Sequence, residues 1–251
     1  MTVLARVLAV ALLAISVGAW AQAPLPALVQ TDGTFNSAWR FVGFPKAKAD
    51  IPPTRFEAGS VDGVPAVKVL TASSYGTLVK DWTGPTPTRL QWRWRLDTPL
   101  SGGKTAPDIL TKAGDDAALK VCVMFDHALD RVPFVERTVL RIARSVSGEA
   151  LPAATVCYVW DSVHPALTQG SNPYTKRVRF ISLQGKGAPL ARWVQESRDV
   201  EADFATLFAD ELPAGAATPR ITRVLLGADS DNTASASIGW VGDLGWTDRG
   251  P

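Results

Sequence analysis

The sequence predicts an all-β fold, a single antiparallel β-sandwich or jelly roll of two sheets with one short helix. Three observations support this prediction. Apolar and polar residues alternate along many short segments, as in strands that bury one face. Clusters of Gly, Pro, Asn and Asp separate these segments. No Pro-rich or Gly/Ser-rich linker and no internal repeat divides the sequence, so we expect one domain over residues 37–248.

The first 21 residues have the pattern of an export signal. Arg6 is their only charge, an apolar run follows over Val7–Val17, and Ala19-Trp20-Ala21 fits the small-x-small cleavage rule. The apolar run is shorter than the about 20 residues that a membrane span needs. We therefore expect cleavage after Ala21, a mature protein in the periplasm or outside the cell with no membrane span, and an extended lead-in over residues 22–36.

Ten segments show the alternation expected of strands. In the clearest, Leu90, Trp92, Trp94 and Leu96 share one face. The flanking leucines favour a core position for the tryptophans over an open aromatic platform for sugar rings. The expected strands, in chain order, are Val64–Leu70, Gly76–Asp81, Leu90–Leu96, Leu119–Phe125, Thr138–Ala143, Thr155–Trp160, Val178–Leu183, Leu190–Glu196, Ile221–Leu226 and Ser235–Trp246.

One segment has helical spacing. Asp199 can cap a helix over Val200–Phe208, in which Phe204, Leu207 and Phe208 share a face. Residues 102–114 and 164–176 are expected to be loops, and loops of that length at one end of a sandwich commonly carry binding sites.

Two acidic turns are the main candidate site. Asp115 and Asp116 precede the strand Leu119–Phe125, and Asp229-Ser230-Asp231-Asn232 follows the strand that begins at Ile221. Such oxygen-rich turns hold hydroxyl groups, bind a hard cation or hydrogen-bond their own backbone. Asp229, Asp231 and Asn232 have the oxygen ligands that Ca²⁺ prefers, but lack the Gly and the distal Glu of a helix–loop–helix calcium site. Turn hydrogen bonding is therefore the favoured interpretation, and Ca²⁺ the alternative.

Three further side chains are candidates for ligand contact. Tyr158 and Trp160 share a face at the end of a strand and either belong to the core or line a cleft beside the loop of His164. Arg198 either forms an ion pair with Asp203 at the start of the helix or contacts a ligand.

The two cysteines, Cys122 and Cys157, lie in separate expected strands. In an oxidising compartment they form a disulfide if those strands are neighbours, and otherwise remain two small buried thiols. The order of strands does not follow from the sequence, so both possibilities stay open.

Composition excludes some functions. The full chain has 26 Lys and Arg, which leaves 25 after Arg6 is removed, against 24 Asp and Glu. This balance, with no basic run, gives no reason to expect a nucleic-acid partner. The chain contains only two His, and it has no Gly-x-Ser-x-Gly, His-Glu-x-x-His, Cys-x-x-Cys or Gly-rich phosphate motif. No catalytic template is therefore indicated, and the oligomeric state is not indicated either.

Several of these motifs together resemble a bacterial family known as domain-of-unknown-function family 3047. The resemblance covers roughly Trp39 to Trp246. It rests on Trp92-x-Trp94-Arg95, Lys112-Ala113-Gly114-Asp115-Asp116-Ala117-Ala118 with Val121–Asp126, Tyr158-Val159-Trp160, Arg198-Asp199-Val200-x-x-Asp203-Phe204 with Phe208, and Asp229-Ser230-Asp231-Asn232-Thr233. It implies an exported jelly-roll domain with no assigned activity. Cys122 departs from the expected pattern, so a disulfide would be specific to this chain.

Three functions fit these observations. The first is a periplasmic binding domain for a glycan or another polyhydroxylated ligand, which aromatic side chains and the acidic turns would hold. The second is a glycan hydrolase or lyase with two carboxylates at catalytic separation, drawn from the two acidic turns and Asp243. The third is a structural or assembly protein of the cell envelope, in which the acidic motifs only stabilise turns. Fold analogy alone suggests the sugar.

Overall fold

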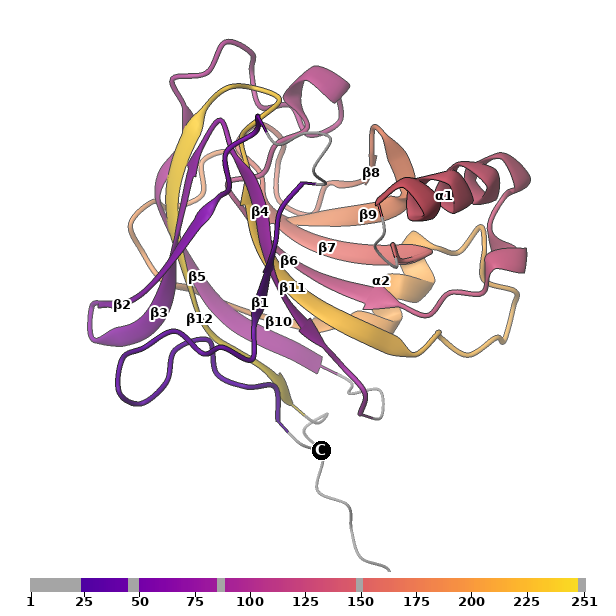
Figure 1. The fold of residues 1–251 in the computed structure, drawn as a ribbon, viewed down its shortest axis with the longest axis horizontal. Coiled ribbons are helices and arrows are strands. Elements are labelled where there is room, and N and C mark those ends of the chain that lie inside the picture. The colour runs from indigo at the N-terminus through magenta and orange to yellow at the C-terminus, as the bar shows by residue number, and fades with distance from the viewer. Residues whose placement is uncertain (1–23, 45–49, 85–88, 148–150, 248–251) are drawn as a thin grey trace, which may run out of the picture.

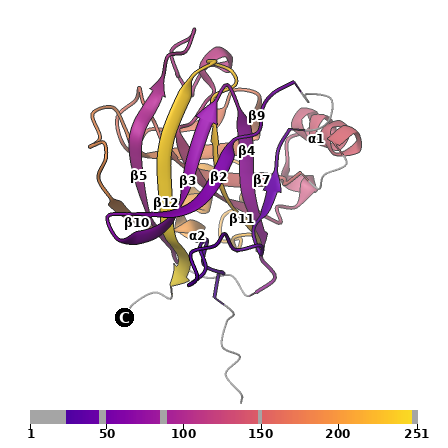
Figure 2. The same cartoon turned by 60° about the vertical axis from the view of Figure 1, so that its left-hand side comes forward.

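The computed structural model describes residues 24–44, 50–84, 89–147 and 151–247. Two sheets pack face to face, as Figures 1 and 2 show. The expected signal peptide lies outside the described residues. Among the described residues, no helix is long and apolar enough to cross a membrane.

The larger sheet has seven strands, and one of its neighbouring pairs is parallel. In spatial order the strands are β1 (Arg40–Val42), β4 (Tyr75–Asp81), β11 (Ile221–Asp229), β6 (Leu119–Phe125), β7 (Ala154–Trp160), β9 (Thr175–Gln184) and β8 (Gln169–Asn172). The parallel pair is β7 and β9, and the other pairs are antiparallel. The hairpin of β8 and β9 occupies much of the segment expected to be a loop over residues 164–176.

The smaller sheet has five strands, all paired antiparallel. In spatial order they are β10 (Val194–Asp199), β5 (Arg89–Ser101), β12 (Ala236–Thr247), β3 (Val64–Ala72) and β2 (Arg55–Val61). β10 begins four residues later than the expected strand Leu190–Glu196, because residues 185–193 form turns. The predicted β-sandwich of two sheets is confirmed, although β7 and β9 are parallel where only antiparallel pairs were expected.

The core lies between the sheets and is rich in aromatic side chains. Trp92 packs 5.3 Å from Tyr158, and Trp94 packs 5.5 Å from Trp160, measured between ring centroids. The core interpretation of the tryptophan strand is therefore correct, and the alternative of an open sugar platform is wrong. The lead-in also joins the core, because Leu25, Leu28 and Val29 are buried and a bridge between Val29 and Phe35 closes a turn.

The expected helix is present and carries its cap. α2 spans Val200–Leu207, and the Asp199 side chain accepts a hydrogen bond from the backbone N–H of Ala202 at 3.1 Å. This contact satisfies one of the free donors at the start of the helix. Phe204 and Phe208 are fully buried, as their shared face predicted.

A second helix, α1 (Phe134–Ser147), replaces the expected strand Thr138–Ala143. That prediction was wrong because it judged six residues rich in β-branched side chains in isolation. Over the longer window, Val135, Val139 and Ile142 recur at helical spacing, and Pro133 stands just before the first turn. α1 lies beside β8 and β9 at the edge of the larger sheet (Figure 1).

Candidate functional site

The two acidic turns meet in space at one end of the larger sheet. Asp116, which is buried, accepts hydrogen bonds from the backbone N–H of Thr233 at 2.7 Å, from its hydroxyl at 2.5 Å, and from the backbone N–H of Asn232 at 3.3 Å. The Asn232 side-chain amide donates to the backbone carbonyl of Asp115 at 3.0 Å. The residues joined by these contacts are 116 or 117 positions apart in the sequence, yet the two turns form one structural unit, called the acidic unit below.

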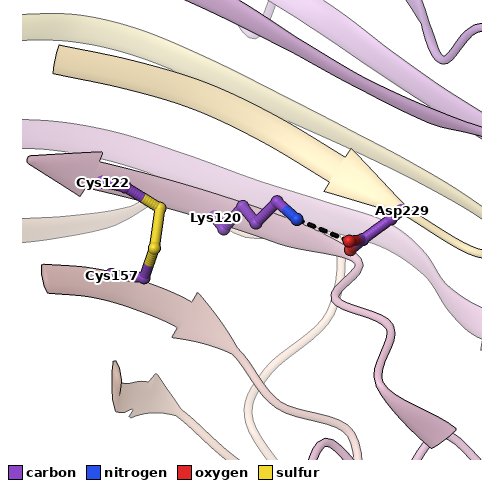
Figure 3. The surroundings of a disulfide bond; sticks show 4 residues. All are labelled: Lys120, Cys122, Cys157 and Asp229. Atoms are coloured by element: carbon purple, nitrogen blue, oxygen red, sulfur yellow. Dashed lines mark hydrogen bonds and ion pairs between the residues drawn. A yellow bond between two sulfur atoms is a disulfide. The ribbon is translucent and has the colours of Figure 1, made fainter. Parts of the chain in front are cut away.

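Asp229 connects this unit to the sheet. Its Oδ1 accepts from the backbone N–H of Ala117 at 2.8 Å, and its Oδ2 accepts from Lys120 Nζ at 2.5 Å (Figure 3). Although burial lowers it, the charge of Asp229 raises the pKa of Lys120 above its usual value. Lys120 thus remains an ammonium, lying 5.3 Å from the ring centroid of Tyr75.

Two carboxyl groups of the unit have strongly perturbed acidity. Burial, and then the charge of Asp229, raise the pKa of Asp115 to about 6. The same two causes, followed by the charge of Asp116, raise the pKa of Asp231 to about 6. Burial also raises the pKa of Asp229. Carboxylates crowded in this way are stabilised by a proton, a cation or hydrogen-bond donors from a ligand.

The metal-ligand set differs from the one expected. One carboxylate oxygen each from Asp116, Asp229 and Asp231 lie within 4.8 Å of one another, so these three are the candidate ligands. Asn232 is committed elsewhere, because its side chain donates to Asp115 and accepts from the Tyr174 hydroxyl at 3.2 Å. Asp116 and Asp229 already accept several protein hydrogen bonds, as the favoured turn interpretation requires. The Ca²⁺ site itself stays a prediction.

A cavity of about 230 Å³ opens beside the acidic unit, on the face of the larger sheet that points away from the core. Asp115, Asp116 and Asp229 line one end. The walls and floor are largely apolar and include the Cys122–Cys157 disulfide, Ile109, Val159, Phe180 and Leu225.

The disulfide follows from the register of two strands. Cys122 of β6 lies opposite Cys157 of β7, and their Cα atoms are 4.1 Å apart. The bonded sulfurs are drawn in Figure 3, two residues along β6 from Lys120. Since side chains alternate along a strand, Lys120 and Cys122 project from the same face.

Thr155 is an unusual member of this cavity. Its residue is 3% exposed, it lines the cavity, and its hydroxyl has no hydrogen-bond partner within the described residues. A buried hydroxyl without a partner is costly, by about 1–3 kcal/mol. Thr155 therefore offers an unused polar group to whatever occupies the cavity, at a distance along β7 from the carboxylates.

The structure corrects three of the predicted ligand contacts. Tyr158 and Trp160 are 0% and 2% exposed in the core, so no ligand reaches them. The Tyr158 hydroxyl instead donates to Asp203 at 2.7 Å, and Arg198 pairs with the same carboxylate at 2.5 Å. Arg198 thus forms the structural ion pair at the start of α2, the alternative to ligand contact.

Asp243, the fifth carboxylate considered for catalysis, lies apart from the others. It pairs with Arg93 on the smaller sheet. Sequence reasoning also missed Lys120, Asn172 and Thr155. Lys120 was recognisable, since it lies one alternation before Cys122 on a strand that starts beside the acidic turn. Asn172, which donates to Asp115 at 2.5 Å, and Thr155 depend on strand order and had no signal in the sequence.

The fold and site define a β-sandwich protein with an acidic, lysine-containing cluster at the end of an apolar cavity. The chain belongs to the DUF3047 family of proteins of unknown function, whose model matches residues 37–245. The family resemblance inferred from the motifs is thereby confirmed.

Other comparisons concern distant structures. The K3 cleaved adhesin domain of Lys-gingipain from Porphyromonas gingivalis w83 has a TM-score of 0.38 and 10% identity, over 90% of this chain and 100% of that chain. The xyloglucanase domain of NopAA from Sinorhizobium fredii, in complex with cellobiose, has a TM-score of 0.41 and 10% identity, over 84% of this chain and 93% of that chain. At these values neither likeness bears on ligand or reaction. No curated protein matches the sequence.

Proposed function

We propose that this chain is an exported, periplasmic or secreted binding protein for a glycan or another small polyhydroxylated ligand. The observation that carries the proposal is the meeting of the two acidic turns at the polar end of an apolar cavity. Carboxylates accept hydrogen bonds from hydroxyl groups, while an apolar surface packs against the C–H face of a sugar ring.

The individual side chains have separate roles in this proposal. Asp115, which lines the cavity, and Asp231 of the adjoining acidic turn accept from ligand hydroxyls, which offsets their crowding by the charge of Asp229. Lys120 donates to a ligand oxygen from the edge of the cluster. Thr155 contacts a hydroxyl farther along the cavity. The volume of about 230 Å³ lies below the about 300 Å³ at which drug-sized sites begin, so it suits one ring and not an oligosaccharide.

An array of monosaccharides and oligosaccharides, probed with and without Ca²⁺, tests this proposal, followed by calorimetry on the best binder. Asp115→Asn and Asp231→Asn are each expected to weaken binding tenfold or more, because a hydrogen bond to a charged acceptor contributes about 1.5–3 kcal/mol. Asp243→Asn is the matched control, since Asp243 is exposed and lies apart from the cluster. Absence of binding to every glycan under both conditions would rule the proposal out.

A glycan hydrolase or lyase is the second candidate, and the raised pKa values favour it. A carboxyl group with a pKa of about 6, as Asp115 and Asp231 have, can donate a proton near neutral pH. An enzyme would release new reducing ends from a polysaccharide, and Asp115→Asn or Asp231→Asn would abolish that release. A bound glycan recovered intact after prolonged incubation would favour the binding protein.

Ca²⁺ binding by Asp116, Asp229 and Asp231 is a separate prediction. Thermal melts with and without Ca²⁺, on the natural protein and on Asp231→Asn, test it. A rise in Tm that Asp231→Asn abolishes would establish a metal site. An unchanged Tm would leave the cluster as a hydroxyl acceptor or as turn architecture, the role that an envelope assembly protein would require.

A further inference from the structure

A larger groove adjoins the cavity beside the acidic unit. It has a volume of about 690 Å³ and runs between α1 and the hairpin of β8 and β9. Leu151, Pro152, Asn172 and Val178 line both spaces, so the two lie next to each other. Asn172 stands at the junction, donating to Asp115 on one side and lining the groove on the other.

The groove is largely apolar, although Glu136 on α1 and polar residues of the hairpin also line it. Val139, Leu140 and Ala143 of α1 form one wall, and Pro173, Tyr174 and Val178 contribute to the other. The single proton of the Tyr174 hydroxyl can be donated either to the Lys112 carbonyl at 3.0 Å or to Asn232 Oδ1 at 3.2 Å, so this wall is tied to the acidic unit.

α1 presents an unusually apolar surface beside this groove. Val135, Val139 and Ile142 are 71%, 57% and 59% exposed, and they recur at i, i+4 and i+7, so they share one side of the helix. Phe134 of α1 is exposed as well, so four of the large apolar side chains exposed among the described residues lie on this helix. Exposed apolar residues gathered in this way, unlike scattered ones, mark a surface that binds something.

α1 is nevertheless held firmly at the groove. Glu136 pairs with Arg177 of β9 at 2.6 Å, and Arg144 donates to the Leu151 carbonyl at 2.7 Å. Leu140 packs with Val132 and Ala153 in a small separate cluster. The apolar side of α1 is therefore fixed in place beside the groove.

We infer that the ligand is an amphiphile, with a hydroxylated head at the acidic unit and an apolar chain along the groove toward α1. This inference rests on the proposed function for the head. The adjacency of the two spaces and the contrast between their linings carry it. Carboxylates and Lys120 lie at one end of the cavity, while Val139, Leu140 and Ala143 of α1 line the groove and would pack against an alkyl chain.

Isothermal calorimetry with methyl, butyl, hexyl and octyl glucoside, each below its micellar concentration, tests the inference. Affinity is expected to rise roughly two- to fourfold per methylene, the upper value corresponding to full burial of each CH₂. Val139→Asp is expected to flatten this dependence and to leave methyl glucoside binding unchanged. Thr138→Asp, which adds the same charge one residue away but does not line the groove, is the matched control.

A second variant and a second amphiphile separate the two proposals. Asp231→Asn is expected to weaken every glucoside by a similar factor. Octyl tetraethylene glycol ether has the same chain without a sugar and should bind at least tenfold more weakly than octyl glucoside. Glucoside binding that does not depend on chain length would overturn the amphiphile and leave the proposed function standing.

Three other outcomes would also contradict the inference. Equal binding of the glucoside and the glycol ether, insensitive to Asp231→Asn, would refute the headgroup site and with it the proposed function. Absence of binding by all four glucosides overturns the inference. The protein could also sediment with anionic lipid vesicles, lose this property in Val139→Asp, and bind glucosides without dependence on chain length. That result would overturn the amphiphile and assign the apolar side of α1 to a membrane surface.

Discussion

Carboxylates of one cluster have opposite effects on stability, because their surroundings differ. Asp116 is fully engaged by the donors of Asn232 and Thr233. Asp116→Ala leaves those buried donors unpaired, at a cost of about 1–3 kcal/mol. We expect Tm to fall by roughly 2–4 °C for each kcal/mol in a domain of this size. Melts of Asp116→Ala beside Asp243→Ala measure this, and equal Tm values in the two variants would contradict it.

Removing the charge of Asp231 is expected to raise stability, in contrast to the loss expected for Asp116→Ala. Its pKa of about 6 lies above the ordinary 3.8, so its ionised form is disfavoured in the folded protein. The folded state then binds more protons than the unfolded state between these values, and stability falls as pH rises through them. Asp231→Asn removes the penalty. Discounting for its partial exposure, we expect a gain of about 1 kcal/mol at pH 7.

Melts at two pH values check that expectation. The gain in Tm for Asp231→Asn should be clear at pH 7 and nearly vanish at about pH 3, where the carboxyl group is mostly protonated in both states. Combined with weaker glycan binding, a more stable variant would identify Asp231 as a residue kept for function at the expense of stability. A loss of stability at pH 7 would instead indicate that Asp231 supports the turn.

Of the two α-helices, α1 has the smaller set of core contacts supporting it. Leu140 is buried in a three-member cluster apart from the main core. Leu140→Ala costs about 2–5 kcal/mol where a buried Leu is fully packed. We expect this loss to loosen α1 locally while the sandwich remains folded. Hydrogen exchange should show lost protection within residues 134–147 and unchanged protection in β6 and β7, whereas uniform loss across the sheets would show that α1 is part of the main cooperative unit.

The elements also show what sequence reasoning could reach. Period-two alternation identified most strands of the described residues, because a sheet with one buried face imposes that pattern, but it missed β1, β2 and β8. A six-residue window misjudged Thr138–Ala143, since the helical spacing of Val135, Val139 and Ile142 shows only over a longer segment. The meeting of Asp116 with Thr233 required knowledge that β6 and β11 are neighbours. Strand order depends on contacts between segments distant in sequence, and local pattern does not encode it.

At the scale of the whole molecule, the disulfide closes a long loop. Cys122 and Cys157 are separated by 35 residues that include α1. Chain entropy predicts a stabilisation of about 3–4 kcal/mol for such a loop. The double variant Cys122→Ala/Cys157→Ala is therefore expected to melt roughly 10 °C lower. Since the bridge also floors the cavity, binding should be measured well below the lowered Tm. An unchanged Tm would show that the sheet alone determines stability here.

Opposed titrations set the pH dependence of the whole protein. Burial raises the pKa of Glu211, but hydrogen bonds from Arg177 and His127 outweigh it and lower that pKa from 4.5 to about 2. Its contribution is therefore present above pH 4.5 and is lost as pH falls toward 2. Asp115 and Asp231, with pKa values of about 6, reduce stability as pH rises from about 4 to 6.

The two effects act on opposite sides of a maximum. We expect Tm to be highest near pH 4, where the two titration ranges meet, to fall on the acid side through Glu211, and to fall on the neutral side through the acidic unit. Glu211→Gln should flatten the acid side, while Asp115→Asn/Asp231→Asn should flatten the neutral side. A ligand whose hydroxyls satisfy those carboxylates should raise Tm more at pH 7 than at pH 4. The pH profile thus tests the proposed site through stability alone, and a neutral side that neither the double variant nor a bound glycan changes would count against it.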